Sequence, residues 1–280
     1  MRHEGLSKTA QPSQAKGSRP LAAGVIRLQP TSSYRPLAEA GNKKTGSLLN
    51  DVEIELRQRY RVEAQTFDHR GTRLDMILPA APEELIDVSA FNEDERLPYW
   101  AELWPSAKSL SRYLIDNPPP GPIIELGCGL ALPSLVLLAR GGEAGGVLAT
   151  DYYSDALEFA RTNAARNDLP ELATRLLDWR DPALEGQTFA TVLAADVLYE
   201  RRNADSLSKL IPRIVRPGGS LLLADPGRAY REHFDNRMHA LGWTSTVEAE
   251  LAEPQSAAAD APISHILILR YLAPAEPPRR

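Results

Sequence analysis

The feature that most constrains the fold is an alternation of apolar runs and helical patterns that begins after Pro118–Pro120. Runs typical of strands lie at residues 123–126, 147–150, 173–177, 189–195 and 220–224. Between and after them, helical patterns lie at residues 132–140, 154–167, 206–215 and 229–241. This order predicts an α/β fold with a doubly wound, mostly parallel, Rossmann-like sheet.

The segments on either side of this alternation predict further elements. Residues 243–251 and 265–272 are typical of two closing strands, which bring the sheet to seven strands and form an antiparallel hairpin at one edge. A helix is expected from Trp104 to Asn117, because apolar residues recur there at helical spacing. Residues 58–67 and 72–78 flank a turn-forming DHRG segment and predict an N-terminal β-hairpin.

The N-terminal residues differ in composition from the remainder. Residues 1–48 are rich in polar residues and lack periodicity, so we expect a disordered basic tail. The first 50 residues carry a net charge of about +6, and the remainder about −11. The tail is a dispensable segment, an organelle-targeting or regulatory segment, or the product of an over-extended start of translation. We expect an extension with the hairpin at residues 49–103 and the main domain at residues 104–280.

Composition excludes several classes of protein. No apolar run reaches the roughly 18 residues needed to cross a bilayer, and no secretory signal is evident, so we expect a cytoplasmic protein without membrane contact. Cys128 is the sole cysteine, which leaves no disulfide framework and no cysteine-based metal cluster. The acidic body disfavours binding to a nucleic-acid backbone and is compatible with a cationic substrate, such as a lysine on a partner protein.

Carboxylates follow four of the predicted strands. Asp151, Asp178, Asp196 and Asp225 each stand at or just beyond a strand end. Ligands of doubly wound sheets bind at the carboxyl ends of the strands. We therefore expect these four side chains to face one crevice.

A glycine turn follows the first parallel strand in the segment ELGCGLAL. Gly127 and Gly129 permit a tight turn and a close approach of the backbone to a ligand. Glu125 suits an ammonium better than a pyrophosphate, and Ala131 stands where a third glycine might be expected; both features disfavour NAD. Asp151 can bind ribose hydroxyls, which supports a nucleoside-containing cofactor without identifying it. A nucleophilic role for Cys128 is the alternative to a small turn residue, although no histidine is near in sequence.

Five segments in register resemble methyltransferase family 16, a group of class I S-adenosylmethionine-dependent enzymes. They are LPYWAELWPSAKSLSRYL, ELGCGLALPSL, ATDYYSDALEFARTNAARND, LLDWRDP and AADVLYE. The similarity spans about residues 57–272 and leaves the tail outside. The family includes protein lysine methyltransferases and members described as nicotinamide N-methyltransferase-like.

The resemblance implies a cofactor site for S-adenosylmethionine. Its residues are Trp104, which would close over the cofactor, Glu125, Gly127, Cys128 and Gly129 around the amino-acid portion, Asp151 at the ribose, Asp178 and Trp179 at the adenine, and Ala195 beside the sulfonium. Ala131 departs from the third glycine of many members. We expect its methyl group to be a small perturbation.

The resemblance also implies a catalytic motif. Asp196 and Tyr199 match the D-x-x-Y motif of the family's lysine methyltransferases, in which the carboxylate accepts hydrogen bonds from the acceptor amine and the tyrosine forms a wall. The alternative roles are a helix cap and a packed aromatic ring. The segment AADVLYE lacks the two prolines typical of base-specific amino methyltransferases, which disfavours a nucleic-acid substrate.

A third segment, DPGR, bears on the substrate. It resembles a segment of one group of lysine methyltransferases and makes Asp225 and Arg228 tentative substrate-binding residues. Arg228 either contacts a carboxylate near the substrate lysine or forms only a local salt bridge.

Taken with the resemblance, these features predict an N-methyltransferase that acts on a lysine of a partner protein, as a monomer and without a metal. The alternatives are a small-molecule N-methyltransferase for a nicotinamide-like heterocycle or an amine, and a binding protein without catalytic activity.

Overall fold

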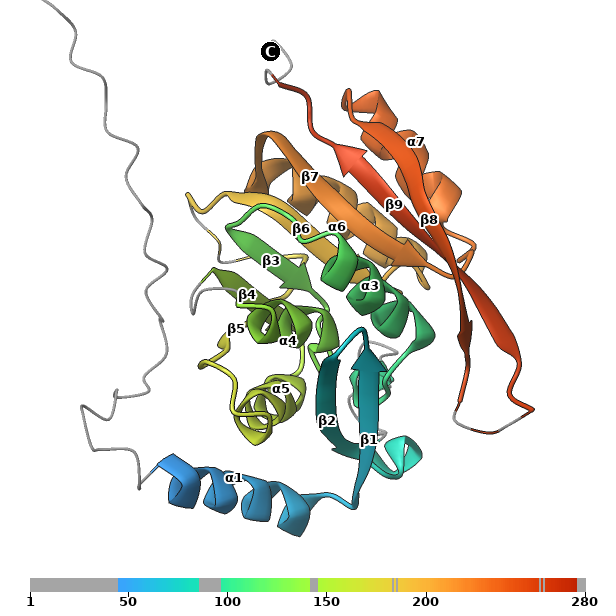
Figure 1. Ribbon diagram of the computed structural model, residues 1–280. Coiled ribbons are helices and arrows are strands. Elements are labelled where there is room, and N and C mark those ends of the chain that lie inside the picture. Colours follow the sequence, from blue (N-terminus) through green and yellow to red (C-terminus); the bar gives the residue numbers. More distant parts are fainter. Residues whose placement is uncertain are drawn as a thin grey trace, which may run out of the picture.

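A computed structural model describes residues 45–85, 97–141, 146–182, 184, 186–256, 258 and 260–275. Within them seven strands form one sheet (Figure 1): β3 (Ile123–Leu126), β4 (Val147–Asp151), β5 (Ala173–Leu176), β6 (Phe189–Ala195), β7 (Val215–Asp225), β8 (Thr244–Pro254) and β9 (Ile263–Leu272). Their order is β5-β4-β3-β6-β7-β9-β8. Strands β3 to β7 are parallel, and β9 is antiparallel to both β7 and β8. The predicted fold class, including the antiparallel edge hairpin, is confirmed.

Helices cover both faces of the sheet (Figure 1). They are α3 (Pro105–Asp116), α4 (Leu132–Ala139) and α5 (Ser154–Arg166) on one face, and α6 (Arg201–Ile214) and α7 (Arg231–Ala240) on the other. Consecutive strand residues alternate between the two buried clusters, as Ile123 and Ile124 do. A strand that is buried on both faces must be apolar throughout, which explains the continuous apolar runs in the sequence.

The order of the strands creates a switch point next to β3. From β3 the chain proceeds to β4 and β5 on one side and then returns to β6 on the other side of β3. At such a point the connections that leave the carboxyl ends of the strands diverge and open a crevice. The glycine turn follows β3 directly, so it lies at the mouth of this crevice.

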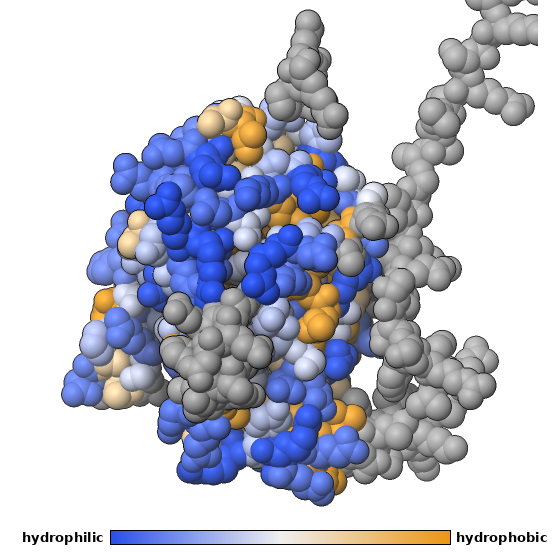
Figure 2. All heavy atoms as spheres, turned by 180° about the vertical axis from the view of Figure 1, so that it is seen from behind, coloured by the Kyte–Doolittle hydropathy of each residue, from blue (hydrophilic) through white to orange (hydrophobic). Residues whose placement is uncertain are grey.

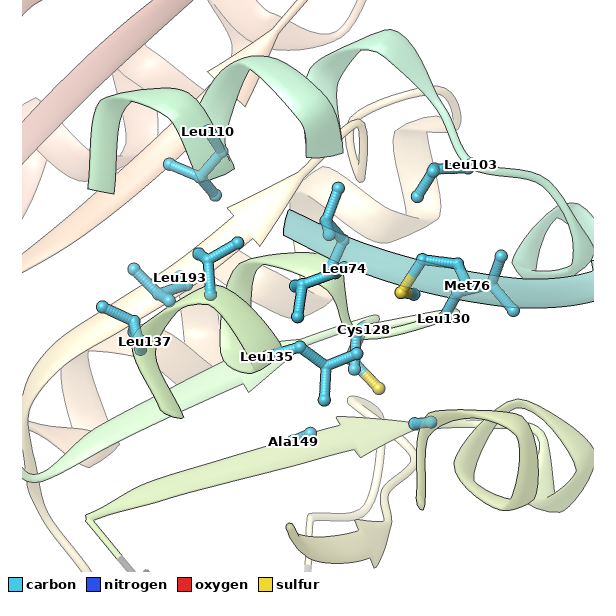
Figure 3. Packing of buried hydrophobic residues seen from close by; sticks show 14 of the residues in the cluster. Leu74, Met76, Leu103, Leu110, Cys128, Leu130, Leu135, Leu137, Ala149 and Leu193 are labelled. Carbon is cyan, nitrogen blue, oxygen red and sulfur yellow. The ribbon is translucent and has the colours of Figure 1, made fainter. Parts of the chain in front are cut away.

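A two-stranded hairpin packs outside the helices of the first face. It consists of β1 (Val62–His69) and β2 (Thr72–Pro79), which confirms the predicted N-terminal hairpin. Figure 3 shows Leu74 and Met76 of this hairpin near Leu110 of α3 and Leu135 of α4 in one hydrophobic cluster. A side chain of α5 then holds the hairpin in place.

Asn163 of α5 makes that attachment. Its Oδ1 accepts a 2.7 Å hydrogen bond from the Ile77 amide, and its Nδ2 donates a 3.0 Å hydrogen bond to the Ile77 carbonyl. One buried amide side chain thus makes both hydrogen bonds that a neighbouring strand would otherwise make to the Ile77 backbone at the outer edge of β2.

The helix α1 (Thr45–Arg59) was not predicted. Leu56 is fully buried, and Arg59 forms a 2.5 Å salt bridge with Glu158. The prediction of a strand from Gln58 was wrong at its start, because the long polar residues before Arg59 favour a helix. Residues 1–44 of the predicted tail lie outside the described residues, whereas its last residues, from Thr45, belong to α1.

Other differences are small. Helix α6 begins at Arg201 rather than at Ser206, and β7 begins at Val215 rather than at Ser220. The Pro-Gly-Gly segment at residues 217–219 lies inside β7. The pairing of β7 with β6 is irregular there, because its register shifts between Phe189 and Thr191 of β6. Between the hairpin and α3 lie the 3-10 helices η1 (Pro82–Leu85) and η2 (Tyr99–Ala101), and residues 86–96 lie outside the described part.

The surface view in Figure 2 shows a face on which hydrophilic residues predominate and hydrophobic ones form small groups. Among the described helices none is long and apolar enough to cross a membrane.

Candidate active site

A cleft opens at the carboxyl ends of β3, β4 and β6. It brings together the residues predicted for the cofactor and the catalytic motif: Trp104, Glu125, Gly127, Cys128, Gly129, Asp151, Asp178, Trp179, Ala195, Asp196 and Tyr199. Segments far apart in the sequence therefore meet in one hollow, as the strand order predicts.

The glycine turn after β3 has a backbone that favours glycine at several positions. Gly127 and Gly129 have φ of +67° and +51°. A Cβ atom on Gly127 would lie 3.0 Å from the ring of Trp179, and one on Gly129 would lie 3.1 Å from the carbonyl oxygen of Trp100. Glycine at these positions thus permits both the positive φ and the close packing of the turn against Trp179 and Trp100.

Ala131 is strained in this turn. Its φ is +59°, in the left-handed region, although it carries a Cβ atom. Such a conformation costs an L-residue about 1–2 kcal/mol. We expected the methyl group of Ala131 to be a small perturbation. The group itself is small, but that expectation did not include the cost of its left-handed backbone conformation.

Glu125 lies beneath the turn and is almost completely buried. Its Oε2 accepts hydrogen bonds from the Ser134 amide at 3.1 Å and from the Ser134 hydroxyl, at the N-terminus of α4. Burial raises the pKa of Glu125 to about 8, against these hydrogen bonds and with a smaller contribution from the charge of Asp151. A cationic ligand would bind favourably to such a buried carboxyl group, because the charge of the ligand stabilises the ionised form of the carboxyl group.

Asp151 connects the end of β4 to the glycine turn. Its Oδ2 accepts a 2.9 Å hydrogen bond from the Gly129 amide, and its Oδ1 accepts one of 3.0 Å from the Tyr153 amide. The side chain is therefore held in one orientation while it lines the cleft.

The adenine end of the predicted cofactor site follows β5. Asp178 forms a 2.7 Å ion pair with Arg180, and its Oδ1 also accepts a hydrogen bond from the Arg180 amide. The indole of Trp179 lies against Gly127. Asp178, Trp179 and Arg180 all line the cleft.

Cys128 is buried within the turn. Burial raises the pKa of its thiol well above the usual value, and the nearby carboxylates Asp151 and Glu125 act in the same direction. A thiol that resists ionisation is a poor nucleophile. The structure therefore supports a packing role for Cys128.

Asp196 is the most constrained residue of the catalytic motif. It follows β6 with φ of +58°, and its amide donates a 2.9 Å hydrogen bond to the Ala224 carbonyl of β7. Its side chain is only 7% exposed, and its Oδ1 accepts a 2.5 Å hydrogen bond from Arg228 Nε. The Ser106 hydroxyl lies 3.5 Å from Oδ2. A non-glycine residue held in the left-handed region is a feature of functional sites.

Aromatic rings border Asp196 on the open side of the cleft. Tyr99 stacks edge-to-face on Tyr199, with ring centroids 5.1 Å apart, and on Trp104 at 6.0 Å. The Trp104 indole nitrogen donates a 2.7 Å hydrogen bond to the Tyr99 carbonyl. Sequence reasoning missed Tyr99, although it lies in a segment that carries the family resemblance; its place in the short helix η2 leaves no periodic signal.

Asp225 does not face the cleft, so the expectation of four converging carboxylates was wrong for this residue. It is fully buried, and its Oδ1 accepts hydrogen bonds from the amides of Gly227 at 2.8 Å and Arg228 at 3.0 Å. The turn after β7 uses the carboxylate internally. Arg228 does not line the cleft either, but its guanidinium forms an ion pair with Asp196, which does.

The methyltransferase domain family matches residues 120–260, half of the chain, which includes the glycine turn, Asp151 and Asp196. The chain belongs to the methyltransferase family.

Relatives of this methyltransferase include two with assigned acceptors. The electron transfer flavoprotein beta subunit lysine methyltransferase of Xenopus laevis is 34% identical over 47% of this chain and 54% of that protein. The protein N-terminal and lysine N-methyltransferase EFM7 of Cryptococcus neoformans is 31% identical over 41% of this chain and 43% of that protein. The chain spans about half the length of the curated relatives it matches.

Among solved structures, a putative SAM-dependent methyltransferase from Streptococcus mutans superimposes with a TM-score of 0.50 and 10% identity, over 75% of this chain and 55% of that one. At this identity the likeness shows the fold alone.

Proposed function

We propose that the protein is an S-adenosylmethionine-dependent N-methyltransferase that methylates a lysine side chain of a partner protein. The observation that carries this proposal is that Asp196 and Tyr199, from the end of β6, line the same cleft as the glycine turn of β3. A methyl donor bound at the turn and an amine bound at Asp196 would be neighbours.

The residues of the cleft fit the cofactor. Glu125 offers a buried carboxyl group to the ammonium of the amino-acid portion, and Asp151 offers oxygen atoms to the ribose hydroxyls. Gly127 and Gly129 line the cleft and let the turn pack closely against Trp179 and Trp100, which a Cβ atom on either residue would disturb. When bound, S-adenosylmethionine supplies a methyl group on a positively charged sulfur. The residues of this chain bind, orient and shield the two reactants.

The acceptor side of the cleft suits an amine. Methyl transfer requires the nitrogen lone pair to point at the methyl carbon, so orientation accounts for much of the acceleration. Asp196 accepts hydrogen bonds from the N–H groups of the amine, while Tyr99 and Tyr199 enclose the aliphatic part of a lysine. The lone pair forms the new C–N bond, the electron pair of the broken C–S bond returns to sulfur, and the surplus proton on nitrogen leaves to water.

The surroundings of the cleft support a polypeptide acceptor. A second hollow shares Leu97, Tyr99 and Glu102 with the cleft and extends toward Glu63 and Glu83. A free heterocycle would need only the inner cleft, whereas a peptide with a basic residue beside its lysine would also contact this outer hollow.

Radiolabelled S-adenosylmethionine tests the proposal. The protein is incubated with purified electron transfer flavoprotein β subunit, with whole lysate, and with a deproteinised small-molecule fraction, and Asp196→Asn serves as the control. We expect label on lysine in a protein band for wild type and a strong reduction for the variant. Label that appears in the small-molecule fraction alone would contradict a protein substrate.

A further inference from the structure

The ion pair between Arg228 and Asp196 joins the turn after β7 to the acceptor side of the cleft. Arg228 Nε lies 2.5 Å from Asp196 Oδ1. The carboxylate is nearly buried, whereas the arginine side chain is 35% exposed. One oxygen of the Asp196 carboxylate is therefore already bonded to a cation.

The turn fixes where the guanidinium points. Asp225 is fully buried and accepts hydrogen bonds from the amides of Gly227 and Arg228. Arg231 of α7 approaches the same carboxylate to 3.8 Å. Because the Arg228 backbone is tied to a buried group, its side chain leaves from a defined position toward Asp196.

A carboxylate without this partner would act against the reaction. An opposite charge within about 4–6 Å stabilises a lysine as its ammonium by about 1–3 pKa units. The ammonium has no lone pair to attack the methyl carbon, and an unperturbed lysine, with a pKa of about 10.4, is already charged at neutral pH. A carboxylate that is paired with a guanidinium keeps its free oxygen for hydrogen bonding, while its net attraction for a cation is largely cancelled.

We propose that Arg228 is a positioning residue of the transfer reaction: its guanidinium neutralises Asp196, so that the cleft takes up the acceptor lysine as the neutral amine. This inference rests on the proposed function. Arg228 cancels the charge of Asp196 and adds a positive charge of its own, and both effects disfavour a second cation at the same place. The titratable and charged groups around the pair are Asp225 after β7, Arg231 on α7, Tyr99 on η2, and Glu102, Tyr199, Glu200 and Arg202 at the cleft.

The pH dependence of turnover tests the inference. kcat is measured from pH 7 to 10.5 with saturating S-adenosylmethionine and electron transfer flavoprotein β subunit as acceptor. The proteins are wild type, Arg228→Gln, Arg228→Lys and, as the matched control, Arg237→Gln, which removes a guanidinium of α7 that pairs with Asp205.

We expect the rising limb of the kcat profile to move up by about 1–3 pH units in Arg228→Gln. Its kcat at pH 7.5 should be lower by about 10- to 1000-fold, and within a few-fold of wild type at pH 10.5. Arg228→Lys should keep the rising limb at the wild-type pH but with a lower kcat, and Arg237→Gln should not move the limb. A kcat of Arg228→Gln that is lower by the same factor at every pH would overturn the inference, since lost structure alone gives that result.

A second measurement does not depend on the protein acceptor. Calorimetry follows the binding of n-butylamine, a mimic of the lysine side chain, to the complex with S-adenosylhomocysteine between pH 8 and 11. The affinity of wild type should rise with pH as the neutral amine forms, and that of Arg228→Gln should rise less or fall. Equal pH dependence in both proteins would contradict the role of Arg228. Absence of methyl transfer to the β subunit by wild type would instead count against the proposed acceptor.

Discussion

The amide of Gly129 donates a 2.9 Å hydrogen bond to Oδ2 of Asp151, and this contact joins the glycine turn of β3 to the end of β4. One carboxylate thus shapes the turn and lines the cleft. Asp151→Ala should weaken the binding of S-adenosylhomocysteine by a few kcal/mol, because charge-assisted hydrogen bonds are lost and the turn loses its support. Calorimetry measures the change. The exposed substitution Asp68→Asn should leave the affinity unaltered, and an equal affinity of Asp151→Ala would refute the ribose role.

Gly129→Ala should cost more stability than Gly71→Ala. Both glycines have positive φ, so both substitutions strain the backbone by about 1 kcal/mol. At Gly71 nothing lies within 4 Å of the added Cβ atom, whereas at Gly129 it would be 3.1 Å from a backbone carbonyl oxygen, which cannot yield easily. Thermal unfolding should show a larger decrease in Tm for Gly129→Ala, together with loss of cofactor binding. Equal decreases in Tm would show that the approach to Trp100 is unimportant.

Glu125 should make the protein less stable as the pH rises. Burial raises the pKa of Glu125 from its usual 4.5 to about 8, so in this window the folded state retains a proton that the unfolded state has lost. The free energy of unfolding therefore falls with increasing pH between these values. Glu125→Gln cannot ionise and keeps an oxygen for Ser134.

Urea unfolding at pH 5.5 and 8.5 tests this effect. The decrease in the free energy of unfolding between the two pH values should be larger in wild type than in Glu125→Gln, by an amount of the order of a few kcal/mol. The ammonium group of a bound ligand should stabilise ionised Glu125. Saturation with S-adenosylhomocysteine should therefore bring the pH dependence of the free energy of unfolding of wild type closer to that of Glu125→Gln. Parallel pH profiles of the two proteins would mean that Glu125 ionises normally.

The sequence predicts the sheet well because its strands are buried on both faces, and continuous apolar runs such as 189–195 have few alternative structures. Helix α1 escaped prediction because few of its residues are apolar and Leu56 alone is fully buried among those whose side chains are described. The strand ends placed Asp151 and Asp196 at the cleft. They misplaced Asp225, because a strand end does not reveal whether the next turn will use the carboxylate for its own amides.

We propose that Asp196 holds the methyl acceptor. It ends the strand whose last residue, Ala195, also lines the cleft, and its side chain is nearly buried. Asp196→Asn keeps the shape and removes the charge, so it should leave the affinity for S-adenosylhomocysteine within a few-fold of wild type. Turnover should be lower by roughly two or more orders of magnitude, the scale of lost positioning or acid–base assistance. Tyr199→Phe should be milder, because the ring that stacks on Tyr99 remains.

The most direct measurement determines cofactor affinity and methyl transfer for wild type, Asp196→Asn and Tyr199→Phe on the same protein acceptor. We expect intact cofactor binding in all three proteins and a large loss of turnover in Asp196→Asn alone. If Asp196→Asn transfers methyl groups as fast as wild type, Asp196 is only a structural residue at the end of β6, and the acceptor binds elsewhere in the cleft.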